Sequence, residues 1–161
     1  MALKVNFTGK ASLSTETLPT GYTTDVGNGI GMLDGRLGLL KGRVDAALTG
    51  GTNTSTDTYE VIYVPAGFYI MNVWAYVVEA EATNTTATIE VGIGDDPDEF
   101  IKATSPDTTG EIFGMTGDAL AINGTVLTAA DTIDITVATA ALTNAVIDVY
   151  ALVVDMRETR T

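Results

Sequence analysis

The residues of this sequence with the clearest potential for chemistry are four carboxylates in one five-residue run, Asp95-Asp96-Pro97-Asp98-Glu99. Clustered carboxylate oxygens are the ligands that calcium prefers. The run lacks the spacing of the twelve-residue calcium loop with its central glycine and terminal glutamate, and Pro97 restricts how the side chains converge. Two interpretations therefore stand: a solvated acidic turn, or a weak metal site made by Asp95, Asp96, Asp98 and Glu99.

Other catalytic chemistry is restricted by composition. The chain has no histidine and no cysteine, which removes the usual general base near neutral pH and the thiolate nucleophile and ligand. A glycosidase pair needs an apolar pocket that raises one carboxyl pKa, and nothing around the acidic run suggests one. The glycine-rich stretch at 27–31 lacks the spacing of a dinucleotide-binding motif and predicts turns instead. We expect no enzymatic activity and no cofactor.

The basic residues offer a second candidate site. Arg36, Lys41 and Arg43 are three of only eight cations, and they lie in one apolar segment, 36–47, that reads as a strand. Charged side chains on an edge strand resist edge-to-edge aggregation. The segment is therefore either a solvated edge or a contact strip for an acidic partner.

The overall charge excludes some partners. At −13, the chain has no cluster of cations able to displace counterions from a nucleic-acid backbone, and an anionic membrane surface would repel it. No apolar run approaches the roughly 20 residues of a membrane span. Residues 1–4 lead into polar sequence rather than a signal peptide, so we expect synthesis in the cytoplasm.

The elements that must position these residues are strands. Segment 57–94 is the most apolar part of the chain and reads as strands at 57–64, 68–80 and 86–93, which predict a three-stranded antiparallel meander. Further strands are predicted at 100–104, 131–137 and 145–156. Short strands separated by Gly, Pro and Asn turns favour an all-β fold, a jelly-roll-like antiparallel β-sandwich of about eight strands.

The sandwich is expected to occupy residues 21–156, followed by a charged tail at 157–161. Residues 1–20 open with an alternation of Leu3, Val5 and Phe7 and predict either a first strand or an arm that orders against another subunit. Trp74 is either core or part of an aromatic ligand platform. The expected core comprises Tyr63, Phe68, Ile70, Trp74, Tyr76, Ile89, Val91, Ile135, Val149 and Val153.

Two motifs carry a resemblance. The strand and turn DTYEVIYVPAG at 57–67 and the segment VGIGDDPDEF at 91–100 resemble a group of small virion proteins of tailed bacteriophages, the capsid decoration (cement) or head-fibre proteins. The likeness covers roughly residues 36–101. It implies a β-sandwich, commonly a homotrimer, that sits on the outer surface of the virion capsid and stabilises it by bridging subunits of the major capsid protein. It implies no catalytic residues.

The residues leave two other functions open. A tail or neck component of the virion would also be acidic, all-β and oligomeric. A non-catalytic carbohydrate-binding module would present exposed aromatic side chains and often a calcium ion. Under the capsid hypothesis, the arm residues Leu3, Val5 and Phe7 and the basic residues Arg36, Lys41 and Arg43 are the expected contacts with partners.

Overall fold

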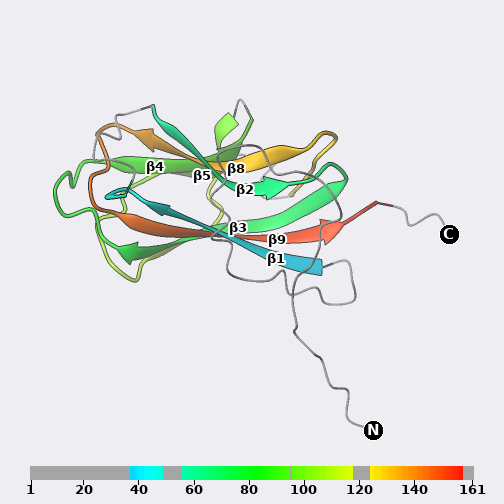
Figure 1. Cartoon of the computed structure of the whole chain (residues 1–161), viewed down its shortest axis with the longest axis horizontal. Helices are drawn as coiled ribbons and strands as arrows, with labels where there is room; N and C mark the ends of the chain where they lie inside the picture. Colours follow the sequence, from blue (N-terminus) through cyan, green and yellow to red (C-terminus); the bar gives the residue numbers. More distant parts are fainter. Residues whose placement is uncertain (1–36, 49–55, 95, 118–123, 158–161) are drawn as a thin grey trace, which may run out of the picture.

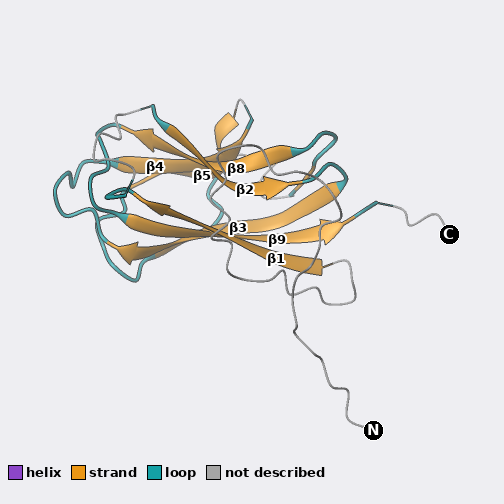
Figure 2. Ribbon diagram, in the orientation of Figure 1, coloured by secondary structure: helices purple, strands orange, loops and turns teal. Residues whose placement is uncertain are grey.

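The structure is a computed structural model, and it describes residues 37–48, 56–94, 96–117 and 124–157. The described residues form strands, turns and loops without a helix (Figure 2), and none of them forms a helix long and apolar enough to cross a membrane. The strands are β1 (Leu37–Asp45), β2 (Thr58–Val64), β3 (Phe68–Glu79), β4 (Thr88–Ile93), β5 (Asp96–Thr104), β6 (Ile112–Phe113), β7 (Thr125–Val126), β8 (Asp131–Ala138) and β9 (Val146–Asp155).

These strands form two antiparallel sheets that lie face to face (Figure 1). The five-stranded sheet has the order β1-β9-β3-β6, with β7 also paired to β3. The four-stranded sheet has the order β2-β8-β4-β5. Consecutive strands mostly cross between the two sheets, which is the arrangement of a jelly roll. The expected β-sandwich of about eight strands is therefore confirmed.

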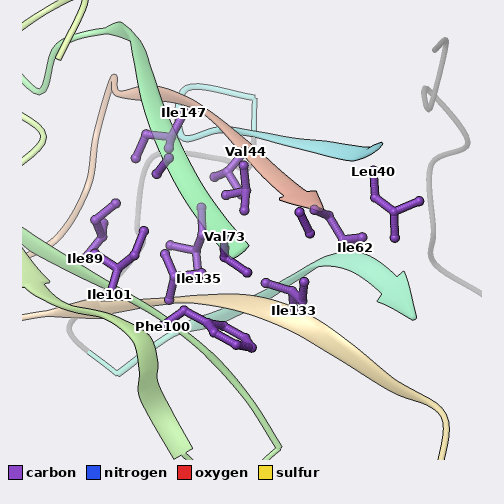
Figure 3. Close-up of a cluster of buried hydrophobic side chains, with 14 of the residues drawn as sticks. Leu40, Val44, Ile62, Val73, Ile89, Phe100, Ile101, Ile133, Ile135 and Ile147 are labelled. Carbon is purple, nitrogen blue, oxygen red and sulfur yellow. The ribbon is translucent and has the colours of Figure 1, made fainter. Parts of the chain in front are cut away.

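The core fills the space between the sheets with aliphatic side chains and two phenylalanines, Phe68 and Phe100, the second of which is labelled in Figure 3. Both sheets contribute: Val73 and Ile147 come from the five-stranded sheet, Ile89 and Ile135 from the other. Their alternation along each strand produces this layer, because successive side chains in a strand point to opposite faces. Gly42 of β1 lies where the sheets converge, since a Cβ there would stand only 2.3 Å from the carbonyl oxygen of Val61 in β2.

The predicted meander is wrong. β2 pairs with β8 in the four-stranded sheet, whereas β3 pairs with β9 in the five-stranded sheet. β4 then returns to the four-stranded sheet beside β8. The turn at Pro65–Gly67 is an arch between sheets rather than a hairpin. Gly67 has a φ of 82° and donates its N–H to the carbonyl of Leu127, outside both flanking strands. Alternation alone does not distinguish an arch from a hairpin, because both leave the same apolar face toward the core.

Three residues of the expected core lie elsewhere. Seven of the ten are buried, but Tyr63, Trp74 and Tyr76 are only half-buried, on outer faces. The pairing of β3 with β9 shifts register between Ile70 and Asn72, so inward positions change from Phe68 and Ile70 to Val73 and the odd positions after it. A shift between Glu60 and Ile62 acts in the same way on β2. Each bulge reverses the phase of the alternation.

One carboxylate joins two loops at one end of the sandwich. Glu81 follows β3 and is only 1% exposed. Its Oε1 accepts hydrogen bonds from the N–H groups of Thr83 and Asn84, at 3.0 Å each, and from the hydroxyl of Thr143 at 2.7 Å. Its Oε2 accepts from the N–H groups of Thr143 and Asn144 at 2.6 and 3.0 Å. Glu81 therefore ties the β3–β4 loop to the β8–β9 loop.

These bonds set the ionisation of Glu81. Burial alone would raise its pKa, but hydrogen bonds from Thr143, Asn144 and Asn84 to the carboxylate lower the pKa from 4.5 to about 2. A carboxyl group whose pKa falls on folding stabilises the fold above its unfolded pKa and loses that contribution as pH falls toward the folded pKa. Glu81 therefore stabilises the protein above pH 4.5 and stops doing so between pH 4.5 and about 2.

We predict that Glu81→Gln lowers the free energy of unfolding at pH 7 by about 3 kcal/mol. The amide has one acceptor oxygen in place of two and turns its NH₂ toward backbone N–H groups. Urea unfolding at pH 7 and pH 3 is the measurement, with the exposed Glu111→Gln as control. The difference between Glu81→Gln and wild type should shrink at pH 3. An undiminished difference there would contradict the assignment.

Candidate interaction surface

The outer face of the five-stranded sheet carries five cross-strand rows of side chains from β1, β9 and β3. The row at one end aligns Asp45 with Val146 and Glu79 and is acidic, and the other four form a connected group. The strand register aligns Leu37 with Val154 and Tyr69, then Leu39 with Leu152 and Asn72, then Lys41 with Tyr150 and Trp74, and finally Arg43 with Asp148 and Tyr76. We call these twelve residues the row face. Two rows are mainly apolar, one is aromatic with a lysine, and one is charged.

The aromatic row is a stack. The rings of Trp74 and Tyr150 lie with centroids 5.5 Å apart and planes within 10° of parallel. The ammonium of Lys41 lies 5.4 Å from the centre of the Tyr150 ring. By register, Lys41 and Trp74 lie on the two strands that flank Tyr150. A carbohydrate platform needs an aromatic face turned to solvent, and here the ring faces of Trp74 and Tyr150 pack on each other. Because each ring has a second face, this stack leaves the platform interpretation a prediction.

The charged row is organised by one buried carboxylate. Asp148 of β9 has only 3% of its side chain exposed, although it lies on an outer face. Arg43 donates from Nε to Oδ1 at 2.6 Å and from Nη2 to Oδ2 at 2.9 Å, and the Nζ of Lys41 lies 2.8 Å from Oδ2. Burial would raise the pKa of Asp148, but the bonds from Arg43 and Lys41 outweigh it and hold the pKa below its ordinary value.

This arrangement bears on the two interpretations of the basic segment 36–47, a solvated edge or a contact strip for an acidic partner. Lys41 and Arg43 are brought together as the strand reading predicted, and the hydrogen bond with Asp148 raises the pKa of Lys41. Their first acidic partner is a residue of the same chain, so the row face carries two cations and one carboxylate. Whether they also contact another protein stays a prediction. Arg36, Leu3, Val5 and Phe7 lie outside the described residues.

The acidic run is not the solvated turn of the first interpretation, and the metal interpretation stays a prediction. Asp96–Glu99 are not a turn but the first half of β5, an edge strand of the four-stranded sheet, where Pro97 is tolerated because an edge position can lack an N–H bond. Asp96 and Asp98 are half-buried and Glu99 is buried. Within the described part of the chain, which leaves out Asp95, no three acidic, histidine or cysteine side chains gather as a metal site.

The outer face of the four-stranded sheet has the opposite character. Its rows align Thr58 with Thr136 and Glu90, and Glu60 with Asp134 and Gly92. The hydroxyls of Thr58 and Thr136 are 3.2 Å apart and share a hydrogen bond. This face is thus polar and acidic, whereas the row face is apolar and aromatic with a small positive charge.

Asp134 has the least favourable environment for a charged carboxylate on the acidic face. Its Oδ1 is buried and has no hydrogen-bond partner. Burial first, then the neighbouring charges of Glu60 and Asp131, raise the pKa of Asp134 from 3.8 to about 6, although a hydrogen bond with the Thr132 side chain opposes them. An acid whose pKa rises on folding destabilises the fold once pH exceeds the unfolded pKa, and the cost is complete above the folded pKa.

The residues that sequence reasoning missed are Asp148 and Asp134. Asp148 is the single charged residue between Ala145 and Val154, in a segment apolar on both faces, and such a residue indicates a paired charge. Asp134 had no comparable signal. It alternates regularly with apolar neighbours, as any solvated residue of a half-buried strand does.

Comparisons with known proteins bear on the fold. No protein-family model and no curated protein matches the chain. Several chains of solved structures do, three of them from phage capsids. A chain of the acid-stable capsid structure of Helicobacter pylori bacteriophage KHP30 matches with a TM-score of 0.55 and 14% identity, over 74% of this chain and 87% of that one.

The other two are also from phage capsids. A chain of the capsid of Ralstonia phage GP4 gives a TM-score of 0.58 at 15% identity, over 77% of this chain and 87% of that one. A chain of the capsid asymmetric unit of cyanophage Pam1 gives 0.58 at 17%, over 85% and 99%. The described sandwich therefore has a fold found in phage capsid structures.

We predict that Asp148→Asn lowers the free energy of unfolding at pH 7 by about 2 kcal/mol, because it removes the charge that pairs with two cations. The exposed Asp107→Asn should change it by less than about 0.5 kcal/mol. Adding Lys41→Met and Arg43→Met to Asp148→Asn should recover part of the loss, since the unpaired cations are then gone. Chemical denaturation of all three variants is the measurement, and an unaffected Asp148→Asn would contradict the pairing.

For Asp134→Asn we predict the opposite sign. The variant should be more stable than wild type by about 1–2 kcal/mol at pH 7.5, a value reduced because the group is partly solvated. The gain should fall to about 0.5 kcal/mol or less at pH 4, where the native carboxyl is protonated and the unfolded one is about half ionised. Thermal melts at the two pH values, with Glu90→Gln as the matched substitution on the same face, test this. A gain that is undiminished at pH 4 would locate its cause elsewhere.

Proposed function

We propose that this chain is a non-catalytic structural virion protein of a tailed bacteriophage, which decorates the outer surface of the capsid and stabilises it by bridging subunits of the major capsid protein. One observation carries the proposal. The jelly roll of this chain matches chains of three phage capsid structures and spans 87–99% of each of them. The fold thus accounts for nearly all of those chains.

Charge supports a position on the exterior. A protein of charge −13 is repelled by packaged nucleic acid, whose phosphates would need cationic partners. The outer face of the four-stranded sheet carries Glu60, Glu90 and Asp134 among threonines, a composition suited to water. The two faces of the sandwich therefore suit a protein that lies on a shell, with one side toward neighbouring proteins and the other toward solvent.

Attachment in this proposal uses the N-terminal arm and the basic strand. Leu3, Val5 and Phe7 alternate as a strand does, and an extended segment can add to the sheet edge of a neighbouring protein through main-chain hydrogen bonds. Lys41 and Arg43 at β1, with Arg36 just before it, supply positive charge beside that attachment. The major capsid protein is the partner, and the decorating unit is a homotrimer.

We predict that deleting residues 1–18 weakens attachment to capsids by about tenfold or more, while the melting temperature changes by only a few degrees. The measurement is co-sedimentation with shells of the phage major capsid protein encoded in the same genome. Replacing the apolar arm residues alone, as Leu3→Ser, Val5→Ser and Phe7→Ser, tests the strand without changing chain length. Full binding by both variants would refute the arm.

The position on the virion has its own test. Antibody raised against the folded chain should label intact virions over the whole capsid. Label confined to the head–tail junction or the tail would contradict decoration and assign the chain to a neck or tail position. Label seen only after the shell is disrupted would contradict the outer location.

A further inference from the structure

We propose that the row face is the surface through which copies of this chain pack on one another. The proposal takes from the proposed function only that the chain works as an assembly. What it adds is the contact surface itself: the outer face of the β1-β9-β3 part of the five-stranded sheet, which is the lower layer in Figure 1.

Exposed apolar side chains concentrate on this sheet. Six large hydrophobic residues are exposed in the described part of the chain, and all but Leu48 lie on strands of the five-stranded sheet or directly after β9: Leu39, Met71, Ile112, Val126 and Met156. Ile112 is paired opposite Tyr76, and Val126 opposite Tyr69, so β6 and β7 extend the row face beyond β3. A contiguous apolar patch, unlike scattered single residues, marks an interaction surface.

Charge identifies the occupant as a second copy. Two molecules of charge −13 repel each other, so they can associate closely only through a surface that lacks their carboxylates. In the row face, Asp148 is the one carboxylate, and it is already paired with Lys41 and Arg43. The charged row and the acidic row of Asp45 and Glu79 beyond it lie at one end of the sheet face, where they can remain at a rim while the apolar rows of neighbouring copies meet.

The face is rigid and of modest size. The four rows span about seven residues of each of three strands, about 24 Å by 14 Å, and β6 and β7 bring this to roughly 400 Å² for each copy, or about 800 Å² for a pair, which is the size of a weak, reversible interface. The Trp74–Tyr150 stack and the bidentate Arg43–Asp148 bond hold their side chains in place before any contact. Such preorganisation reduces the entropy lost on association.

The test is the solution mass of the full chain, measured by light scattering and by sedimentation over a wide range of concentration. Wild type should be oligomeric. Leu39→Glu, which places a carboxylate in the middle of the apolar rows, should weaken association by about tenfold or more. Val126→Glu should do the same from another strand. Ala103→Glu is the matched control, since it adds the same charge to an exposed position of the edge strand β5 and should leave the mass unchanged. Circular dichroism confirms that each variant is folded.

The remaining outcomes overturn the proposal. If wild type is monomeric at every concentration, or if the Leu39→Glu and Val126→Glu variants keep the wild-type mass, the copies do not meet through this face. If removal of residues 1–36 converts a monomer into an oligomer, a segment of the same chain occupies the face. Capsid co-sedimentation separates this from the proposed function: a monomer that binds shells and loses binding on Leu39→Glu uses the face for the capsid, whereas an oligomer that binds no shell refutes the function alone.

Discussion

The pairing of β9 with β3 is the constraint on which the rest of the structure depends. Among the described strands of the five-stranded sheet, only β9 has a long strand on each side, β1 on one and β3 on the other. The register shift between Ile70 and Asn72 determines which residues of β3 point into the core. They are Phe68 and Ile70 before the shift, and Val73 and Ala75 after it. Without that shift, Trp74 and Tyr76 would point into a core already filled by aliphatic side chains, and Val73 and Ala75 would lie outside. The bulge therefore keeps Trp74 and Tyr76 on the outer face and leaves a mainly aliphatic interior with Phe68 and Phe100.

Three carboxylates show how the same fold treats one charge in different ways. Glu81 is buried beneath two loops, and their N–H groups solvate it better than water would. Asp148 is buried under two cations from the neighbouring strand. Asp134 is partly buried beside other acids and lacks a partner for one oxygen. The first two stabilise their ionised forms and the third does not, so acidification removes one contribution to stability while it relieves another cost.

Strand positions followed from the sequence to within a few residues for most of the chain, because β-branched alternation and turn residues are local signals. Their partners did not. Pro65–Gly67 has the composition of a hairpin turn, yet it carries the chain to the other sheet, and only long-range packing decides between these outcomes. The phase reversal at Met71 was equally hidden, since no residue type demands a bulge there. Of the candidate site, Lys41 and Arg43 were found from charge pattern alone, but Asp148, which orients them, is 105 residues from Arg43. The acidic run was predicted to be a turn because acidic residues and a proline are typical of turns. An edge strand also accommodates them, and the sequence does not show that β5 lies at an edge.

An apolar outer face has a cost that explains why the charges lie where they do. A flat sheet face with exposed leucine, methionine and isoleucine invites contact with any apolar surface, and a neutral protein bearing it would aggregate. If copies associate through the row faces as proposed, a net charge of −13 opposes contact in the other orientations. The same charge pattern then gives direction to the assembly: once the row faces are covered, what remains outward is the threonine- and acid-rich face of the four-stranded sheet, which attracts neither nucleic acid nor further copies. In the proposed assembly, association through one face and repulsion through the other would together limit growth and favour a finite complex.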